Sequence, residues 1–326
     1  MKKIEPIQLE LIPSPPEQEN ESQKTETSII KIGELWSLGN HKILIGDSRK
    51  TEDVENACGG LKIDYVFTSP PFGLNLQYER EQTLEELVEL IRLTINNIHK
   101  VTKDDAYATI NYSDVYRHGE PGFTLMSEFY HKPFKDLGWC LRGNRIWLKP
   151  FARLALSYAT STTMSLREWE YIYTWRKGRG REVLRDQGIT ARGVWKTFGE
   201  DAIISDWQKF DFTTDKRLHQ AAFPLALPIV GLRAYTDEGD VVLEPFLGSG
   251  TSLFACEYMK RTCIGIDLEP RYIQRTLDLW LDFKGEEPIR LNDGATWSEV
   301  RKGKIEECDS TLMENDLDSP STTTSI

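Results

Sequence analysis

A short proline-rich turn holds the residues with the clearest chemical potential. It consists of Ser69, Pro70, Pro71 and Phe72, and it follows an apolar stretch that ends at Thr68. Two prolines make the turn rigid and leave nearby carbonyl groups free as acceptors. The Ser69 hydroxyl and the Pro70 carbonyl can accept hydrogen bonds from the amino group of a base, on which Phe72 can stack. Such acceptors would turn the nitrogen lone pair toward an incoming methyl group, so we predict that these four residues are catalytic.

A second turn, rich in glycine, has the features of a cofactor site. Gly248 and Gly250 follow a buried-type strand at 240–244 and precede a helical pattern that begins at Thr251. Glycine lets the backbone approach a ligand closely, and the N–H groups at a helix start favour a carboxylate. Asp267 ends the next strand, where an acid can accept hydrogen bonds from ribose hydroxyls. The turn therefore predicts a cofactor that contains a nucleoside.

Each turn also has a simpler interpretation. A Gly-x-Gly pair often serves strand-to-helix geometry alone, and an isolated Pro-Pro pair usually marks an ordinary loop. A dinucleotide cofactor is a further alternative, but Leu253 replaces the third glycine of the Gly-x-Gly-x-x-Gly pattern, which counts against NAD. Ligands bind beyond the carboxyl ends of parallel strands, so both turns are expected to face one crevice. That shared position favours the functional interpretation of each.

The elements that must position these turns alternate between β-branched runs and helical patterns, as in a parallel sheet covered by helices. Thr83 and Glu86 predict a capping box at the start of an amphipathic helix. We predict an α/β fold with a doubly wound, mostly parallel, seven-stranded sheet. The candidate strands are His41–Gly46, Asp64–Thr68, Ala106–Tyr112, Trp139–Leu148, Glu170–Arg176, Asp240–Glu244 and Thr262–Asp267.

Composition divides the chain into five parts. Residues 1–30 and 301–326 are polar with little to bury, and we predict that both are disordered tails. Residues 31–176 would form the catalytic half of one domain, and residues 215–300 its cofactor-binding half. Between them, the α/β alternation fades over residues 177–214, which predicts an inserted region that recognises the target.

The charge distribution favours a partner that carries phosphate. The net charge of the chain is −11, yet residues 142–196 hold twelve Lys or Arg against four acids. A local basic field attracts phosphate, and arginine can read guanine with two hydrogen bonds. A solvated arginine-rich face is an equal alternative on charge alone. The candidate DNA contacts are Arg145, Lys149, Arg179, Arg181, Arg185, Arg192 and Lys196.

Cysteine usage and hydropathy exclude other classes of protein. The five cysteines are scattered, with no Cys-x-x-Cys pair, so we expect neither a disulfide framework nor a metal site. No apolar run approaches the roughly 20 residues that cross a bilayer, so no membrane contact is expected. The sequence predicts a cytoplasmic protein.

In their order and spacing, these motifs resemble the permuted β class of bacterial and phage DNA amino-methyltransferases. In that family a Ser/Asp/Asn-Pro-Pro-Tyr/Phe motif precedes the recognition region and a Phe-x-Gly-x-Gly motif follows it; residues 68–72 and 246–250 resemble the two. The resemblance implies a circularly permuted, Rossmann-like methyltransferase fold with S-adenosyl-L-methionine as the cofactor. It also implies double-stranded DNA as the substrate, base flipping, and a restriction-modification setting in which a cognate restriction endonuclease is a partner.

The resemblance also assigns cofactor-binding residues. Residues 44–48 resemble a strand whose acid, here Asp47, contacts the cofactor adenine, and residues 219–224 resemble a segment that helps hold the methionine part. Glu244 is a departure, because the family more often has Asp there. The implied cofactor-binding residues are Asp47, Thr68, Phe223, Glu244, Pro245, Phe246, Gly248, Ser249, Gly250, Thr251 and Asp267.

The identity of the target base follows from the first catalytic position. Serine there, as in Ser69, is the family form usually linked to N4 of cytosine, whereas Asp-Pro-Pro-Tyr is usually linked to N6 of adenine. We therefore favour cytosine N4 and keep adenine N6 as the alternative. Two other classes of protein fit the sequence less well. A non-catalytic regulator would need neither turn intact, and the arginine-rich segment argues against methylation of RNA or of a protein glutamine.

Overall fold

One mixed β-sheet contains all seven strands predicted from the sequence. The structure, a computed structural model, describes residues 28–72, 83–116, 123–148, 169–181, 195–196, 203–204, 207–209 and 223–303. The seven strands are β2 (His41–Ile45), β3 (Ile63–Thr68), β4 (Thr102–Tyr112), β7 (Cys140–Leu148), β8 (Trp169–Arg176), β12 (Val241–Glu244) and β13 (Thr262–Asp267).

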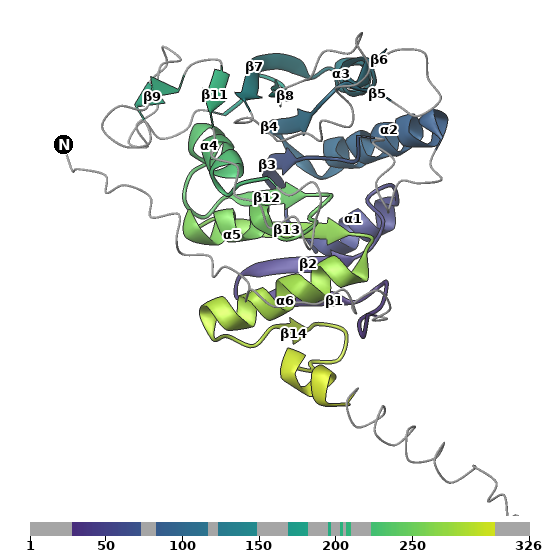
Figure 1. Cartoon of the computed structure of the whole chain (residues 1–326), viewed down its shortest axis with the longest axis vertical. Helices are drawn as coiled ribbons and strands as arrows, with labels where there is room; N and C mark the ends of the chain where they lie inside the picture. The colour runs from purple at the N-terminus through teal and green to yellow at the C-terminus, as the bar shows by residue number, and fades with distance from the viewer. Residues whose placement is uncertain are drawn as a thin grey trace, which may run out of the picture.

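The sheet is wider than predicted, because three short strands extend its edges. These are β1 (Leu35–Leu38), β11 (Trp207–Lys209) and β14 (Ile289–Arg290). The ten strands follow the order β11-β7-β8-β4-β3-β12-β13-β2-β1-β14 (Figure 1). Outside this sheet, two short antiparallel pairs are described: β5 (Val115–Tyr116) with β6 (Phe123–Thr124), and β9 (Trp195–Lys196) with β10 (Ile203–Ile204).

The centre of the sheet is parallel, as the sequence predicted. Strands β4, β3, β12, β13 and β2 all run in one direction, whereas β8 is antiparallel to both β4 and β7. At the other side, β1 and β14 also pair in antiparallel fashion. Strands β3 and β12 lie side by side although they are far apart in the sequence, with Val66 opposite Leu243. The carboxyl ends of the two strands therefore meet.

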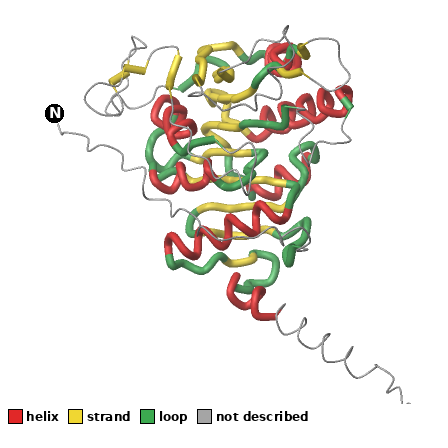
Figure 2. Tube along the Cα trace, viewed as in Figure 1, coloured by secondary structure: helices red, strands yellow, loops and turns green. Residues whose placement is uncertain are grey.

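Helices cover both faces of the sheet (Figure 2). One face carries α1 (Thr51–Cys58), α2 (Leu84–Val101) and α3 (Met126–Asp136). The other carries α4 (Ala226–Tyr235), α5 (Thr251–Tyr258) and α6 (Pro270–Lys284). Each group of helices encloses its own buried apolar cluster against the sheet. The fold is therefore the predicted doubly wound α/β sandwich.

Helix α2 begins as the sequence predicted. Thr83 accepts a hydrogen bond from the Glu86 backbone N–H at 3.2 Å, and the Glu86 carboxylate accepts one from the Thr83 N–H at 2.9 Å. This capping box satisfies two N–H groups that the helix leaves unpaired. The apolar stripe that follows is buried at Leu87, Ile91 and Ile95, so the helix is held to the sheet along its length.

The folded body reaches further toward the amino terminus than predicted. Ile30 is buried in the core, and the Ser28 hydroxyl donates to the side chain of Gln274 in α6 at 3.0 Å. Residues 28–30 are therefore part of the body. Residues 1–27 and 304–326, which make up most of the two predicted tails, lie outside the described residues.

A buried histidine joins β2 to the neighbouring strand and helix. His41 accepts a hydrogen bond at Nδ1 from the Cys263 backbone N–H (2.9 Å), and its Nε2 lies 3.1 Å from a Glu257 carboxylate oxygen. A neutral imidazole with its proton on Nε2 makes both contacts, because Nδ1 then accepts and Nε2 donates. Burial lowers the pKa of His41 below its ordinary value of 6.5. The ring is therefore neutral in the fold.

We expect this histidine to make the protein less stable in mild acid. Below about pH 6.5 the unfolded chain binds a proton that the folded His41 resists, so stability falls with pH by at most about 1.4 kcal/mol per unit. His41→Gln keeps a donor and an acceptor but does not titrate. Melting temperatures at pH 7.0 and 5.5 measure the effect, and the decrease should be smaller in the variant. An equal decrease in both proteins would contradict the assignment.

Candidate active site

The two turns singled out in the sequence lie at the same edge of the sheet. Thr68 is the last residue of β3 and Glu244 the last of β12, and these strands are parallel neighbours. The end of β2 joins them, because the Ser48 hydroxyl donates to the Pro245 carbonyl at 2.6 Å. The predicted shared position of the proline turn and the glycine turn is thus confirmed.

The Ser69 side chain is oriented by a residue that the sequence analysis missed. The Ser69 hydroxyl donates to the side-chain oxygen of Asn111 at 3.1 Å. Asn111 is 1% exposed, and its amide nitrogen donates to the Tyr171 carbonyl at 3.2 Å, which fixes the direction of the amide. Since the hydroxyl proton is engaged, the Ser69 oxygen faces other groups as an acceptor. Asn111 stands on β4 beside β3, a neighbourhood that appears only once the strand order is known.

The rest of the proline turn is held by contacts with α3 and with the apolar core. The Tyr130 hydroxyl of α3 donates to the Pro71 carbonyl at 3.3 Å. Phe72 is 8% exposed and belongs to the apolar cluster beneath α1 and α2. The ring is covered here, which differs from the expected open platform for a base. Phe72 thus anchors the turn in the core, and its placement gives no support to base stacking.

The glycine turn takes a conformation that requires glycine. Gly250 has φ +82°, and a Cβ there would lie 2.8 Å from the Thr276 methyl carbon on α6. Gly248 has φ +54°, and its N–H donates to an Asp267 carboxylate oxygen at 2.7 Å. Helix α5 starts right after Gly250 without a side-chain cap. Its first N–H groups therefore point out of the helix start, where a carboxylate ligand is favoured.

Two acids, one fully buried and one partly exposed, brace this turn. Glu244 is fully buried and accepts hydrogen bonds from the Ser252 hydroxyl (2.8 Å) and the Phe246 N–H (3.2 Å). Burial raises the pKa of Glu244 to about 8. Asp267 accepts N–H bonds from Gly248 and Glu269, and burial raises its pKa to about 6. Glu244 holds the turn from inside the fold, whereas Asp267 is partly exposed, and its carboxylate has further lone pairs that can accept hydrogen bonds.

The acid expected to contact adenine is engaged by a neighbour. Asp47 accepts from the Arg49 side chain at 2.7 to 3.0 Å through both carboxylate oxygens. Burial opposes ionisation of Asp47, but the Arg49 hydrogen bonds outweigh it and lower the pKa. Asp47 is thus an ionised acceptor at the carboxyl end of β2, held in an ion pair whose arginine is 41% exposed.

The remaining predicted cofactor residues line the same edge. Phe223 precedes α4 and packs edge-to-face on Phe67, with ring centroids 5.5 Å apart. The Ser249 and Thr251 hydroxyls lie 3.5 Å apart at the start of α5. Thr68 and Pro245 are buried and Phe246 is partly exposed.

The predicted DNA contacts separate into different places. Arg145 on β7 and Asn111 on β4 pair with the same residue of β8, Ile172, from either side. The Arg145 guanidinium donates to the Tyr235 hydroxyl at 3.0 Å. Arg179 is exposed and Arg181 half-buried in the turn after β8, at the edge where β4 begins. The amino-terminal ends of the central strands lie there, whereas the two motif turns lie at the carboxyl ends. The other four fall outside the described side chains: Lys149, Arg185, Arg192 and Lys196.

The predicted role of Arg181 as a DNA contact does not fit its surroundings in the fold. Its guanidinium is paired with the carboxylates of Asp64, Asp237 and Asp240. A guanidinium held by three acids on the far edge of the sheet does not serve as a phosphate contact. Net segment charge could not reveal this, because the acids come from other parts of the chain.

Two further expectations concern metals and membranes. Within the described ranges, no group of three or more His, Cys, Asp or Glu side chains has an arrangement that could hold a metal ion. None of the helices that the structure describes is long and apolar enough to cross a membrane.

A doubly wound sheet with a rigid acceptor turn beside an uncapped, glycine-rich helix start defines a Rossmann-like methyltransferase. Comparison with known families identifies it further: the DNA methylase model for N6- and N4-methyltransferases matches residues 63–278. The chain belongs to this family. It is an S-adenosyl-L-methionine-dependent DNA methyltransferase of the N4/N6 amino-methylating class. The expected family, activity and cofactor are thus confirmed.

Curated relatives and solved structures agree with this family. The Type II methyltransferase M.MjaI of Methanocaldococcus jannaschii is 27% identical, over 71% of this chain and 88% of its own. M.SmaI of Serratia marcescens is 26% identical, over 72% and 89%. The PvuII cytosine-N4-specific DNA methyltransferase has the same fold, with a TM-score of 0.61 and 19% identity over 78% of this chain and 98% of that one. A putative DNA modification methylase from Thermus thermophilus, solved with S-adenosyl-L-methionine, has a TM-score of 0.51 and 23% identity over 74% and 94%.

We expect Gly250→Ala to abolish tight cofactor binding. The left-handed conformation at position 250 costs alanine about 1 kcal/mol. The new Cβ would also collide with Thr276 of α6, which would move the start of α5. The dissociation constant of S-adenosyl-L-methionine, measured by calorimetry, should rise at least about tenfold. Gly294→Ala is the matched control, because Gly294 has φ +83° but nothing within 4 Å of a new Cβ. Equal affinities in the two variants would contradict the role of the turn.

We expect Asn111→Ala to slow methyl transfer without weakening cofactor binding. The Ser69 hydroxyl loses its acceptor and its fixed orientation, and misplacement of a reacting group costs up to about a hundredfold in rate. The control is Thr109→Val, which removes a buried hydroxyl contact with Thr174 two residues earlier on the same strand. Single-turnover methylation rates distinguish the two. A rate loss in the control as large as in Asn111→Ala would argue for a general packing effect.

Proposed function

We propose that this methyltransferase modifies N4 of cytosine in double-stranded DNA. The residue at position 69 is the observation that carries the choice of base. Ser69 presents a neutral hydroxyl, the form usually linked to cytosine in the family that the sequence resembles. Its proton is engaged by the neutral amide of Asn111, so the pair offers acceptor capacity without a negative charge.

In the proposed reaction, the target amine is gripped at both N–H bonds. The Ser69 oxygen accepts one hydrogen bond and the Pro70 carbonyl accepts the other, which directs the nitrogen lone pair away from the ring. S-adenosyl-L-methionine supplies an electrophilic methyl group on its sulfonium. As the bond from the nitrogen to that methyl formed, the methyl–sulfur bond would break and its electron pair would stay on sulfur, which leaves S-adenosylhomocysteine. The methylated nitrogen would then release one proton to water, because neither Ser69 nor Asn111 is basic. Positioning therefore provides more of the rate than general-base catalysis does.

The cofactor would lie along the carboxyl edge of the central strands. We propose that the α5 start at Gly250 receives its carboxylate, that Asp267 binds the ribose, and that Asp47 accepts from the adenine amine. What supports this is the set of described features at that edge: an uncapped helix start, two glycines with positive φ, Asp267 at the end of β13 and Asp47 just after the end of β2. Phe223 would border the methionine part.

Recognition of the DNA is assigned to the central basic region. We propose that residues 177–214 read the target sequence and that DNA contacts come from Arg145, Lys149, Arg185, Arg192 and Lys196. Arg179 and Arg181 are left out because their turn lies at the far edge of the sheet. The curated relatives are named Type II methyltransferases, which supports a restriction-modification role with a cognate endonuclease and action on DNA in the cytoplasm.

Nucleoside mass spectrometry of DNA from cells that express the chain tests the proposal. We expect N4-methylcytosine with the parent protein and at least about a hundredfold less with Ser69→Ala, because one of two acceptors is lost. The variant should still bind the cofactor, which calorimetry checks. N6-methyladenine in place of N4-methylcytosine would overturn the choice of base, and neither product would overturn the activity on cellular DNA.

A further inference from the structure

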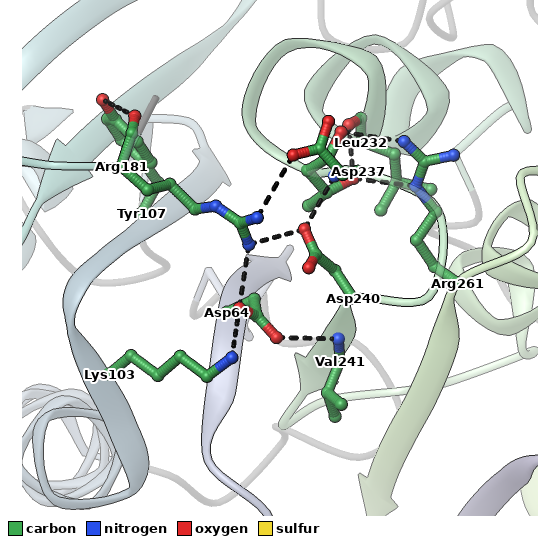
Figure 3. Close-up of polar contacts among 10 residues, drawn as sticks. Asp64, Lys103, Tyr107, Arg181, Leu232, Asp237, Asp240, Val241 and Arg261 are labelled. Carbon is green, nitrogen blue, oxygen red and sulfur yellow. Dashed lines mark hydrogen bonds and ion pairs between the residues drawn. The ribbon is translucent and has the colours of Figure 1, made fainter. Parts of the chain in front are cut away.

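At the amino-terminal ends of the central strands, three carboxylates surround one guanidinium (Figure 3). Arg181 Nη1 lies 2.8 Å from Asp64 Oδ1 and 2.6 Å from Asp240 Oδ2, and Nη2 lies 3.2 Å from Asp237 Oδ2. The side chain of Arg181 is 18% exposed, and each acid is less exposed than that. Pairs as sheltered as these are screened weakly by salt.

Two of the three acids are fixed by further contacts. Asp64 accepts from Lys103 Nζ at 2.6 Å and from the Val241 N–H at 3.0 Å. Asp240 accepts from the Asp237 N–H at 2.7 Å. These contacts hold the Asp64 and Asp240 carboxylates in place, and Arg181 bridges all three acids at once.

The four residues of the cluster come from elements that carry different parts of the candidate site. Asp64 stands at the start of β3, the strand that carries the proline turn. Asp237 and Asp240 form the loop between α4 and β12, the strand that carries the glycine turn. Arg181 itself is tied to β4, because its backbone N–H donates to the Asp105 carbonyl at 2.9 Å. One guanidinium thus joins the catalytic strand, the cofactor strand and the point where the chain enters the proposed recognition region.

We propose that Arg181 is a positioning residue for DNA, which fixes the start of the recognition region against the catalytic and cofactor strands. The inference rests on the proposed role of residues 177–214. A planar guanidinium can bridge several carboxylates in fixed directions, whereas a lysine ammonium is a single point charge. Without Arg181, Lys103 would still pair with Asp64, but the guanidinium bridge from Asp64 to Asp237 and Asp240 would be lost. Repulsion among the acids would then push the loop after α4 away from the start of β3, and the turn after β8 would lose its attachment to both.

A purely structural role makes a different prediction. If Arg181 only neutralised the acids, replacing both the arginine and two of the acids by neutral residues would restore stability and activity together. If Arg181 sets the register of the recognition region, neutralisation would restore stability while DNA binding stays weak, because the bridge itself is missing. The two roles therefore separate in one series of variants.

The series comprises Arg181→Lys, Arg181→Met and Arg181→Met combined with Asp237→Asn and Asp240→Asn. Arg92→Met is the control, since Arg92 pairs with Glu89 on the exposed face of α2. The substrate is plasmid DNA from a host that lacks this methylation. KM for DNA, kcat, cofactor affinity and melting temperature are measured for each full-length protein.

We expect KM for DNA to rise at least about fivefold in all three Arg181 variants, with kcat and cofactor affinity within about twofold of the parent. The neutralised variant should regain the melting temperature that Arg181→Met loses, yet keep the raised KM. An unchanged KM in Arg181→Lys or in the neutralised variant would overturn the proposal, whether or not Arg181→Met folds. If the parent protein itself left the DNA unmethylated, the proposed function would be overturned. A raised or unchanged KM in the Arg181 variants tests only the role of Arg181, because it is compared with an active parent protein.

Discussion

The parallel pairing of β3 with β12 is the constraint on which the rest of the structure depends. Val66 opposite Leu243 sets two strands that are far apart in the chain side by side, with their carboxyl ends together. Both strands are almost wholly buried, so their backbone groups must be satisfied within the ladder. A slip of one residue would move each side chain to the opposite face and displace Ser69 by about 3.3 Å relative to the glycine turn.

Around this pairing, the candidate site consists of weak hydrogen-bond acceptors that neighbouring residues hold in fixed positions. A serine hydroxyl and a proline carbonyl are modest acceptors, so in the proposed reaction the rate enhancement depends on their placement. Asn111 holds the Ser69 hydroxyl and Tyr130 holds the Pro71 carbonyl. On the cofactor side, Glu244 and Asp267 brace the glycine turn through backbone N–H groups. Asn111, Tyr130 and Glu244 are buried, so the geometry belongs to the fold and not to flexible side chains.

The sequence predicted what local patterns encode and missed what depends on neighbours. The seven strands were predictable because runs rich in apolar, β-branched or aromatic residues mark them, whereas β11 and β14 are too short to show a pattern. Asn111 could not be identified without the order of β4 and β3. Arg181 was misplaced because its segment is basic while its acids lie elsewhere in the chain. Phe72 was expected in the crevice, yet an aromatic after two prolines serves the core equally well.

The described part of the proposed recognition region is attached to the body at both ends of the central strands. At the amino-terminal edge, Arg181 binds the starts of β3 and β12 through their acids. Toward the other edge, β11 pairs in parallel with Ile146 to Leu148, the last residues of β7. Strand β7 runs in the same direction as β3, so this pairing lies toward the edge that carries Ser69. Arg181 therefore lies at the amino-terminal ends of the strands, and β11 lies toward the carboxyl ends, where the two motif turns are. The two described parts of the proposed recognition region are thus attached to the body at opposite ends of the strands.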